Sequence, residues 1–167
     1  VGVKGVYEEG FSGKDGRTTI FDWWSVGSVR RLRKVIESGA YKSMDVKELT
    51  KAGLKKEEAE VFVRFAEAIR FASTDSAITK GTTYDLCYCN LSSDGFDKNR
   101  HFAFLRDFED HTVLVASNFS NREVTMKLVI PEHAFEWMEI PITEDMHPGK
   151  IIEVKVGPMD GQKVVLI

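Results

Sequence analysis

Cysteine and proline are scarce in this sequence, long apolar runs are absent, and the charges nearly balance. The 167 residues include two cysteines and four prolines, and the formal net charge is −3. Nucleic-acid binding rewards a strongly basic face, so this charge predicts no nucleic-acid partner. Because no apolar run approaches about 20 residues, we expect no membrane-spanning helix. A hydrophobic fraction of 43% and a charged fraction of 29% are typical of a globular protein.

The two cysteines, Cys87 and Cys89, lie two positions apart on an expected strand. Extended backbone between them disfavours a disulfide, and no second Cys/His pair has the spacing of a metal site. We therefore expect two buried free thiols, no metal and no other cofactor. Two free thiols do not indicate in which cellular compartment the protein functions. No signal peptide or initiating Met precedes Val1, so we expect the chain to come from a longer protein.

The first 80 residues are predicted to form a loop followed by helices. Val1–Trp24 is glycine-rich and lacks periodic apolar positions, which indicates an irregular loop. Ser28 is expected to cap a first short helix that ends before Gly39. Asp45 and Glu48 resemble a capping box, which predicts a second short helix.

The clearest helix is predicted over Lys55–Ser73. Its apolar side chains recur at helical spacing and would form one wide stripe. The stripe consists of Val61, Phe62, Phe65, Ala66, Ile69 and Ala72. Because Val63 and Phe71 project off this stripe, the helix would be apolar on more than one side. Such a helix normally packs between two bodies, and we expect one of them to lie outside this sequence.

After Thr82 the apolar pattern changes from helical spacing to a period of two, which is typical of half-buried strands. His101–Ile130 contains three apolar runs of strand length and predicts a meander. Asp160–Gly161 predicts a hairpin turn. Further strands are expected near Phe135–Ile140, Ile151–Val156 and Val164–Ile167. The sequence thus predicts an α+β fold, with helices over residues 1–80 and an antiparallel β-sandwich of about seven strands over residues 81–167.

No catalytic constellation stands out in the sequence. A nucleophile site needs Ser or Cys with a convergent His and an orienting acid, but the four histidines are expected at strand ends or turns. Asn90 and Asn118 each begin a glycosylation triplet, a pattern that is common by chance. A basic cluster could bind phosphate, but we favour a solvated helix face because no glycine-rich motif accompanies it. The cluster consists of Arg30, Arg31, Arg33 and Lys34.

Six segments of the sequence form an ordered series of motifs. They are DGRTTIFDWWSV (Asp15–Val26), EAEVFVRFAEAIRFA, AITKGTTYDLCYCN (Ala77–Asn90), RHFAFLR, VASNFSNREV and IPEHAFEW (Ile130–Trp137). In that order they resemble the C-terminal end of an α-amylase-type enzyme, glycoside hydrolase family thirteen. The resemblance covers most of the chain, and its motifs are structural. Lys55 and Lys56 depart from it, because a Ser or Thr cap usually opens that helix in the family.

This resemblance implies a (β/α)8 barrel upstream of the chain. Residues 1–80 would be the loop and helices that end the barrel, and residues 81–167 would be the C-terminal all-β domain. The family's catalytic carboxylates lie on earlier barrel strands, so no catalytic residue is expected here. The chain would be a non-catalytic part of an enzyme that acts on α-glucans such as starch by a retaining two-carboxylate mechanism, with the sandwich stabilising the parent. Its partners would be the missing barrel and α-glucan.

Four residues are candidates for carbohydrate contacts. The loop containing Asp15 and Arg17 would project to the cleft side of a barrel, although a purely structural turn is the favoured interpretation. Trp24 and Trp137 could stack on sugar rings, but core packing is the favoured interpretation, above all for Trp24 in the apolar FDWW run. Two other functions remain as alternatives for the whole chain. One is a starch- or α-glucan-binding module, and the other is a protein-interaction domain that uses the off-stripe side of the long helix.

Overall fold

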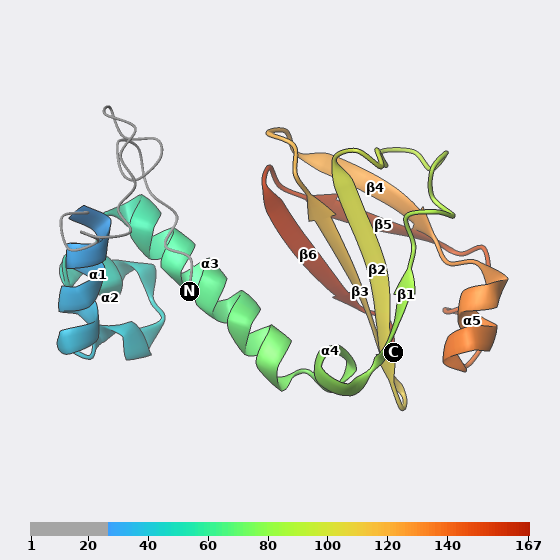
Figure 1. The fold of residues 1–167 in the computed structure, drawn as a ribbon, viewed down its shortest axis with the longest axis horizontal. Coiled ribbons are helices and arrows are strands. Elements are labelled where there is room, and N and C mark those ends of the chain that lie inside the picture. The colour runs from blue at the N-terminus through green and yellow to red at the C-terminus, as the bar shows by residue number, and fades with distance from the viewer. Residues whose placement is uncertain (1–26) are drawn as a thin grey trace, which may run out of the picture. The chain divides into compact units, whose positions relative to one another are not determined.

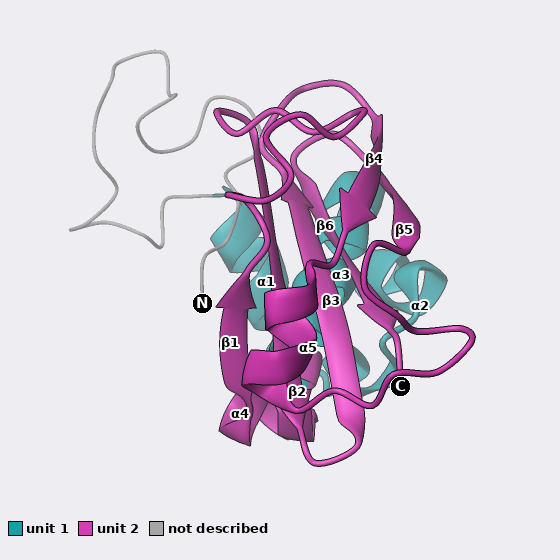
Figure 2. Ribbon diagram, turned by 90° about the vertical axis from the view of Figure 1, so that its right-hand side faces the viewer, with its two compact units in different colours: residues 1–70 teal, residues 71–167 magenta. Residues whose placement is uncertain are grey.

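The computed structural model describes residues 27–167 of the chain (Figure 1). The chain divides into two compact units, residues 1–70 and residues 71–167, which Figure 2 colours separately. Helices make up the described part of the first unit, and antiparallel strands dominate the second. The predicted α+β class, with helices first and strands after them, is confirmed. The boundary between the units falls inside the long helix α3 (Lys56–Thr74), upstream of the Lys80–Gly81 boundary expected from the sequence.

The described part of the first unit is a small helical body. It consists of α1 (Gly27–Glu37), the 3-10 turn η3 (Ala40–Ser43), α2 (Val46–Lys51) and α3 up to Arg70. Their apolar faces meet in a core of Val35, Leu49, Leu54 and Ala59. The predicted helices are confirmed, but Ser28 is not the cap of the first one. It lies inside α1 and is buried.

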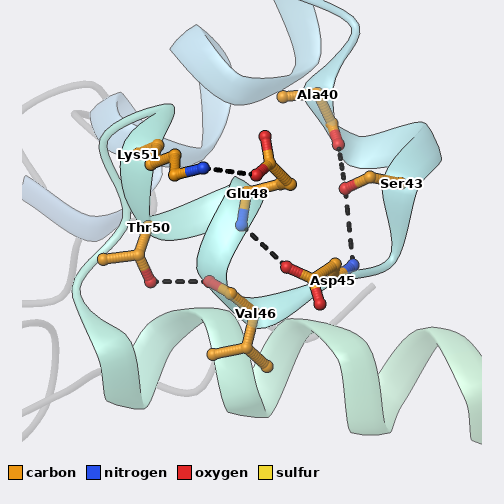
Figure 3. A network of polar contacts seen from close by, with 7 residues as sticks. All are labelled: Ala40, Ser43, Asp45, Val46, Glu48, Thr50 and Lys51. Carbon is orange, nitrogen blue, oxygen red and sulfur yellow. Dashed lines mark hydrogen bonds and ion pairs between the residues drawn. The ribbon is translucent and has the colours of Figure 1, made fainter.

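Polar contacts order the turn that leads into α2 (Figure 3). The Asp45 side chain caps the helix, because its Oδ1 accepts the backbone N–H of Glu48 at 2.9 Å. The Ser43 hydroxyl donates to the Ala40 carbonyl at 2.9 Å. The Glu48 carboxylate pairs with Lys51 at 2.6 Å, rather than returning the bond of a capping box. The predicted cap is confirmed, since Asp45 satisfies a backbone N–H that has no partner within the helix.

Ion pairs occupy part of the basic cluster on α1. The Arg31 guanidinium donates to both carboxylate oxygens of Glu58, over distances of 2.5 to 3.2 Å, and Arg33 pairs with Glu37 at 2.7 Å. Glu58 is buried, and the hydrogen bonds from Arg31 hold its pKa below the usual value. Glu58 also accepts the Lys55 backbone N–H at 2.9 Å. These pairs support the interpretation of the cluster as a helix face rather than a phosphate site.

The apolar stripe predicted on α3 is only partly covered in the described structure. Phe62 of the stripe, and Val63 beside the stripe, pack against the core of the first unit. Phe65 and Ile69 on the same helix are 45% and 49% exposed. In the second unit, the Phe71 ring lies beneath the Lys163 ammonium, which is 3.8 Å from the ring centroid. The helix therefore presents an apolar strip, formed by Phe65 and Ile69, on the surface of the described structure.

Six strands form two antiparallel sheets in the described part of the chain. One sheet has the order β1 (Thr82–Asp85), β2 (His101–Phe108), β3 (His111–Asn118) and β6 (Asp160–Val165), and the other pairs β4 (Val124–Val129) with β5 (Ile151–Val156). Every strand pairing is antiparallel. Buried side chains from both sheets share one core, among them Leu105, Leu114, Met126, Leu128 and Val154. Because two sheets bury their inner faces against each other, this unit is a β-sandwich.

The expected meander is confirmed for β2 and β3 only. These two strands form a hairpin whose last pair is Phe108 and His111, and Glu109 turns the chain with a positive φ of 57°. The next strand, β4, leaves this sheet and pairs with β5. The predicted strand that includes Cys87 and Cys89 ends earlier, at Asp85. Both thiols are free as predicted, but they are half-buried and lie in a turn, where burial raises the pKa of each.

Two further expectations in the last third of the chain are wrong. The strand expected near Phe135–Ile140 is instead the helix α5 (Glu132–Met138), because Ala134, Phe135 and Met138 face the core at helical spacing. Asp160–Gly161 is not a hairpin turn. These residues begin β6, where they pair with Asn118 and Ser117. The turn comes just before them, at Met159, whose φ is 50°, and it carries the chain from one sheet to the other.

Two buried asparagines connect the two sheets. The Asn90 side chain lies beside β4, where its Oδ1 accepts the Val129 N–H at 2.8 Å and its Nδ2 donates to the Val129 carbonyl at 3.0 Å. Asn118, at the end of β3, donates to the Gly157 carbonyl just beyond β5 at 2.9 Å. Both are the first residues of the glycosylation triplets. In the folded chain their amides are buried and bonded to backbone carbonyls, so neither is open to modification.

Candidate functional site

The structure describes one of the four residues proposed from the sequence for sugar contacts. Asp15, Arg17 and Trp24 lie outside the described residues. Trp137 lies on α5 and is 62% exposed, so core packing does not account for it. It belongs to a group of four aromatic rings, Tyr84, Tyr88, His133 and Trp137, which we call the aromatic site.

Helix α5 places two of these rings at the surface. Pro131 precedes the helix in an extended conformation, and Glu139 ends it with a φ of 56° and a backbone N–H that donates to the Phe135 carbonyl. The buried residues Ala134, Phe135 and Met138 anchor one side of the helix in the sandwich core. His133 and Trp137 are four residues apart, so they share the opposite side and can contact each other. Their rings stack with an interplanar angle of 17° and a centroid distance of 6.4 Å.

The other two rings come from β1 and the turn after it. Tyr84 belongs to β1 and is buried, whereas Tyr88 lies in the turn and is 56% exposed. The Asp85 side chain accepts the Cys87 N–H at 2.8 Å, and the Asn90 N–H donates to the Cys87 carbonyl at 3.3 Å. These bonds fold the chain back, so that the Tyr84 and Tyr88 hydroxyls form a hydrogen bond with each other.

Tyr84 joins the two halves of the site. Its hydroxyl lies 3.2 Å from His133 Nδ1, and its ring centroid is 5.8 Å from that of the imidazole. Burial, followed by the hydrogen bond with Tyr88, raises the pKa of Tyr84 well above its usual value. The phenol therefore stays protonated throughout the ordinary pH range, and it can donate one hydrogen bond while it accepts others.

The charged residues of α5 and of its C-terminal cap, which carry part of the aromatic site, are all acidic. Glu132 and Glu136 lie on α5, Glu139 ends it, and all three are exposed. The seven residues of α5 include no Lys or Arg. An anionic ligand such as a phosphate would meet repulsion here, whereas a neutral ligand with hydroxyl groups would not.

Neither a metal-holding cluster nor a further histidine site adds to the aromatic site in the part of the chain that the structure describes. Within residues 27–167, no group of three or more His, Cys, Asp or Glu side chains is placed to hold a metal ion. His111, another histidine with a carboxylate partner, bonds to Asp75 at 3.0 Å and lies beside the backbone carbonyl of Ile167. Asp75 caps α4 (Ser76–Lys80), so this pair has a structural role. The aromatic site combines exposed ring faces with hydroxyl and imidazole groups that can form hydrogen bonds.

Sequence reasoning found Trp137 but missed Tyr84, Tyr88 and His133 as its companions. The expected strand after Thr82 would have put Tyr84 and Tyr88 on one sheet face, and the expected strand near Phe135 would have separated His133 from Trp137. The signal that could have paired the last two was their spacing of four residues in a segment with helix-forming neighbours.

Comparisons with known proteins add no family to this description. The chain matches no protein-family model, and no curated protein matches it significantly. Among the described helices, none combines the length and the apolar character that a membrane crossing requires.

Proposed function

We propose that the chain is the non-catalytic C-terminal part of an α-amylase-type glycoside hydrolase that acts on α-glucans, and that its sandwich stabilises the parent enzyme. One observation carries the proposal. An antiparallel two-sheet sandwich follows a set of helices, in the order that the six sequence motifs imply for the end of a barrel and the all-β domain after it.

The exposed strip on α3 supports the same proposal. Phe65 and Ile69 are large apolar side chains at the surface of the described structure. Full burial of such a side chain contributes about 1.5 to 3 kcal/mol. A helix at the end of a barrel must cover the neighbouring barrel elements, so the occupant we assign to this strip is the catalytic barrel of the parent chain.

Catalysis would then belong to the parent and not to this part of it. A retaining glycosidase needs two carboxyl groups about 5 Å apart across the scissile bond, one as nucleophile and one as acid/base. The motifs that carry these groups in the family are not found in this sequence. We therefore expect the pure chain to release no reducing sugar from starch or maltooligosaccharides, and specific cleavage by it would contradict the proposal.

The reading frame upstream of Val1 and a binding experiment test the structural part. This reading frame should encode a barrel with three acidic catalytic positions, and a frame that encodes no such barrel would refute the proposal. That barrel, expressed separately, should bind the chain and resist heat better in its presence. Phe65→Asp or Ile69→Asp should weaken the association about tenfold or more, because each removes apolar burial.

Glu67→Ala, an exposed change on the same helix, serves as the matched control and should leave the association unchanged. If Glu67→Ala weakened the association equally, the loss would come from a general effect on the helix and not from the apolar strip. A chain that pairs with itself through Phe65 and Ile69 and does not bind the barrel would refute the occupant that we assign to the strip.

A further inference from the structure

The aromatic site is a continuous row of four rings with two exposed ends. The centroid distances along the row are 6.1 Å from Tyr88 to Tyr84, 5.8 Å from Tyr84 to His133, and 6.4 Å from His133 to Trp137. Large aromatic side chains that remain exposed together at one place are uncommon unless they bind something. Since His133 stacks on one side of the indole and Trp137 is 62% exposed, the indole offers apolar area to a ligand.

The polar groups of the row form a hydrogen-bond relay with complementary ends. With the imidazole neutral, the bonds can run from Tyr88 through Tyr84 to His133 Nδ1, which leaves the His133 Nε2–H as an outward donor and the Tyr88 oxygen as an acceptor. The bonds can also run in the opposite direction, and the outward groups then exchange roles. In both cases one end donates while the other accepts.

This pattern matches the chemistry of a sugar better than that of other ligands. A pyranose ring has an apolar C–H face, which packs on an indole, and hydroxyl groups, each of which both donates and accepts. The carboxylates of Glu132, Glu136 and Glu139 disfavour phosphates and therefore nucleotides. A neutral oligosaccharide meets both conditions.

We propose that the aromatic site binds a neutral oligosaccharide, with Trp137 stacked on one sugar ring and the Tyr88–Tyr84–His133 relay bonded to its hydroxyl groups. The choice of an α-linked glucan as the ligand rests on the proposed function. The site therefore keeps the chain in contact with glucan at a place built from β1, its following turn and α5.

The test is a titration of the complete chain, labelled with 15N, with maltoheptaose and with cellohexaose at millimolar concentrations. Trp137 is one of three tryptophans, and its indole Nε1–H resonance is assigned by its loss in Trp137→Ala. We expect maltoheptaose to shift this resonance in a saturable way and cellohexaose to bind at least about tenfold more weakly. Equal binding of both sugars would overturn the assignment to α-linked glucan, and no shift with either would overturn the site.

Variants link the binding to the proposed contacts. Trp137→Ala should weaken maltoheptaose binding, measured by calorimetry, about tenfold or more through lost stacking. Tyr88→Phe keeps the ring and removes one end of the relay, so it should weaken binding about three- to tenfold. Phe119→Ala is the matched control, since Phe119 is 64% exposed but lies outside the row, and it should change nothing.

Circular dichroism confirms that each variant is folded. An unchanged affinity in folded Trp137→Ala, or an equal loss in Phe119→Ala, would refute the site. Such a failure would leave the proposed function intact, because the upstream reading frame and the association with the barrel test that function independently of sugar binding.

Discussion

Asn90→Ala should strongly destabilise the sandwich, although it removes only a small polar side chain. The Asn90 amide bonds to both backbone groups of Val129, so it takes the place of a neighbouring strand along β4. Its Nδ2 also donates to the Leu86 carbonyl at 2.9 Å, and its Oδ1 accepts the Ser93 hydroxyl at 2.7 Å. Asn90 itself is fully buried, so its own amide forms these bonds without contact with solvent.

The expected cost follows from the groups left without a partner. Each buried backbone group that loses its hydrogen bond costs about 1 to 3 kcal/mol. The N–H and the carbonyl of Val129 are two such groups, and water can reach them in part because Val129 is half-buried. We therefore expect the free energy of unfolding to fall by about 2 to 4 kcal/mol. With a urea dependence of about 2 kcal/mol per molar, the unfolding midpoint should fall by about 1 to 2 M.

Urea unfolding followed by circular dichroism measures this loss, and hydrogen exchange at the Val129 amide should accelerate in the variant. Two controls separate the buried amide from its surroundings. Asn121→Ala changes an exposed asparagine, and Ser92→Ala changes an exposed serine in the same glycosylation triplet. Both should stay within about 0.5 kcal/mol of the original chain. A loss below about 1 kcal/mol for Asn90→Ala would refute the reasoning that the amide replaces a strand.

Asn90→Asp provides a second check, because its shape is the same but its ionised form cannot donate. The buried carboxylate would face the carbonyls of Leu86 and Val129, so its pKa should rise above the unfolded value of about 3.9. A raised pKa contributes stability below the unfolded value and loses it as pH rises through the folded value. This variant should therefore compare better with the original chain at pH 4 than at pH 7.

Three further predictions concern other contacts. The hydrogen bond with Asp75 raises the pKa of His111, so the pair contributes to folding stability below pH 6.5 and loses this contribution as pH rises through the folded pKa. In urea titrations, the stability advantage of the original chain over His111→Gln, about 1 kcal/mol or less, should shrink between pH 6 and 9. Gly95→Ala should destabilise the chain by about 2 to 5 kcal/mol in thermal unfolding, because φ is +76° and a Cβ would meet the Thr125 carbonyl. Gly39 has the same φ but lies in open space, so the control Gly39→Ala should destabilise the chain by only about 1 to 2 kcal/mol. Glu58→Gln should lower the stability of the helical unit by about 1.5 to 3 kcal/mol at pH 7, because the hydrogen bonds from Arg31 to the carboxylate weaken. This loss should vanish as pH falls through the depressed pKa of Glu58, and helical ellipticity measured at pH 7 and below that pKa follows it.

The aromatic site depends on both local and distant contacts along the chain. His133 and Trp137 meet because one helix turn brings them together, which is a local effect. Tyr84 reaches His133 across 49 positions of sequence, which only the packing of α5 against β1 achieves. A search for motifs along the chain cannot find such a group, because its members share no fixed spacing.

By itself the sequence determined the α+β class, the long helix, the cap at Asp45 and the hairpin of β2 and β3. Each of these depends on interactions between residues near one another in the chain, such as helical spacing, a cap three residues before its N–H, or a period of two. Only the tertiary structure decided which secondary structure formed near Phe135 and at Asp160–Gly161. Ala134, Phe135 and Met138 pack into the core from one face of a helix. Gly161 pairs with Ser117 of β3 and so belongs to a strand instead of a turn. Local propensity is small beside the burial of several apolar side chains, so the core determined which of the possible structures formed.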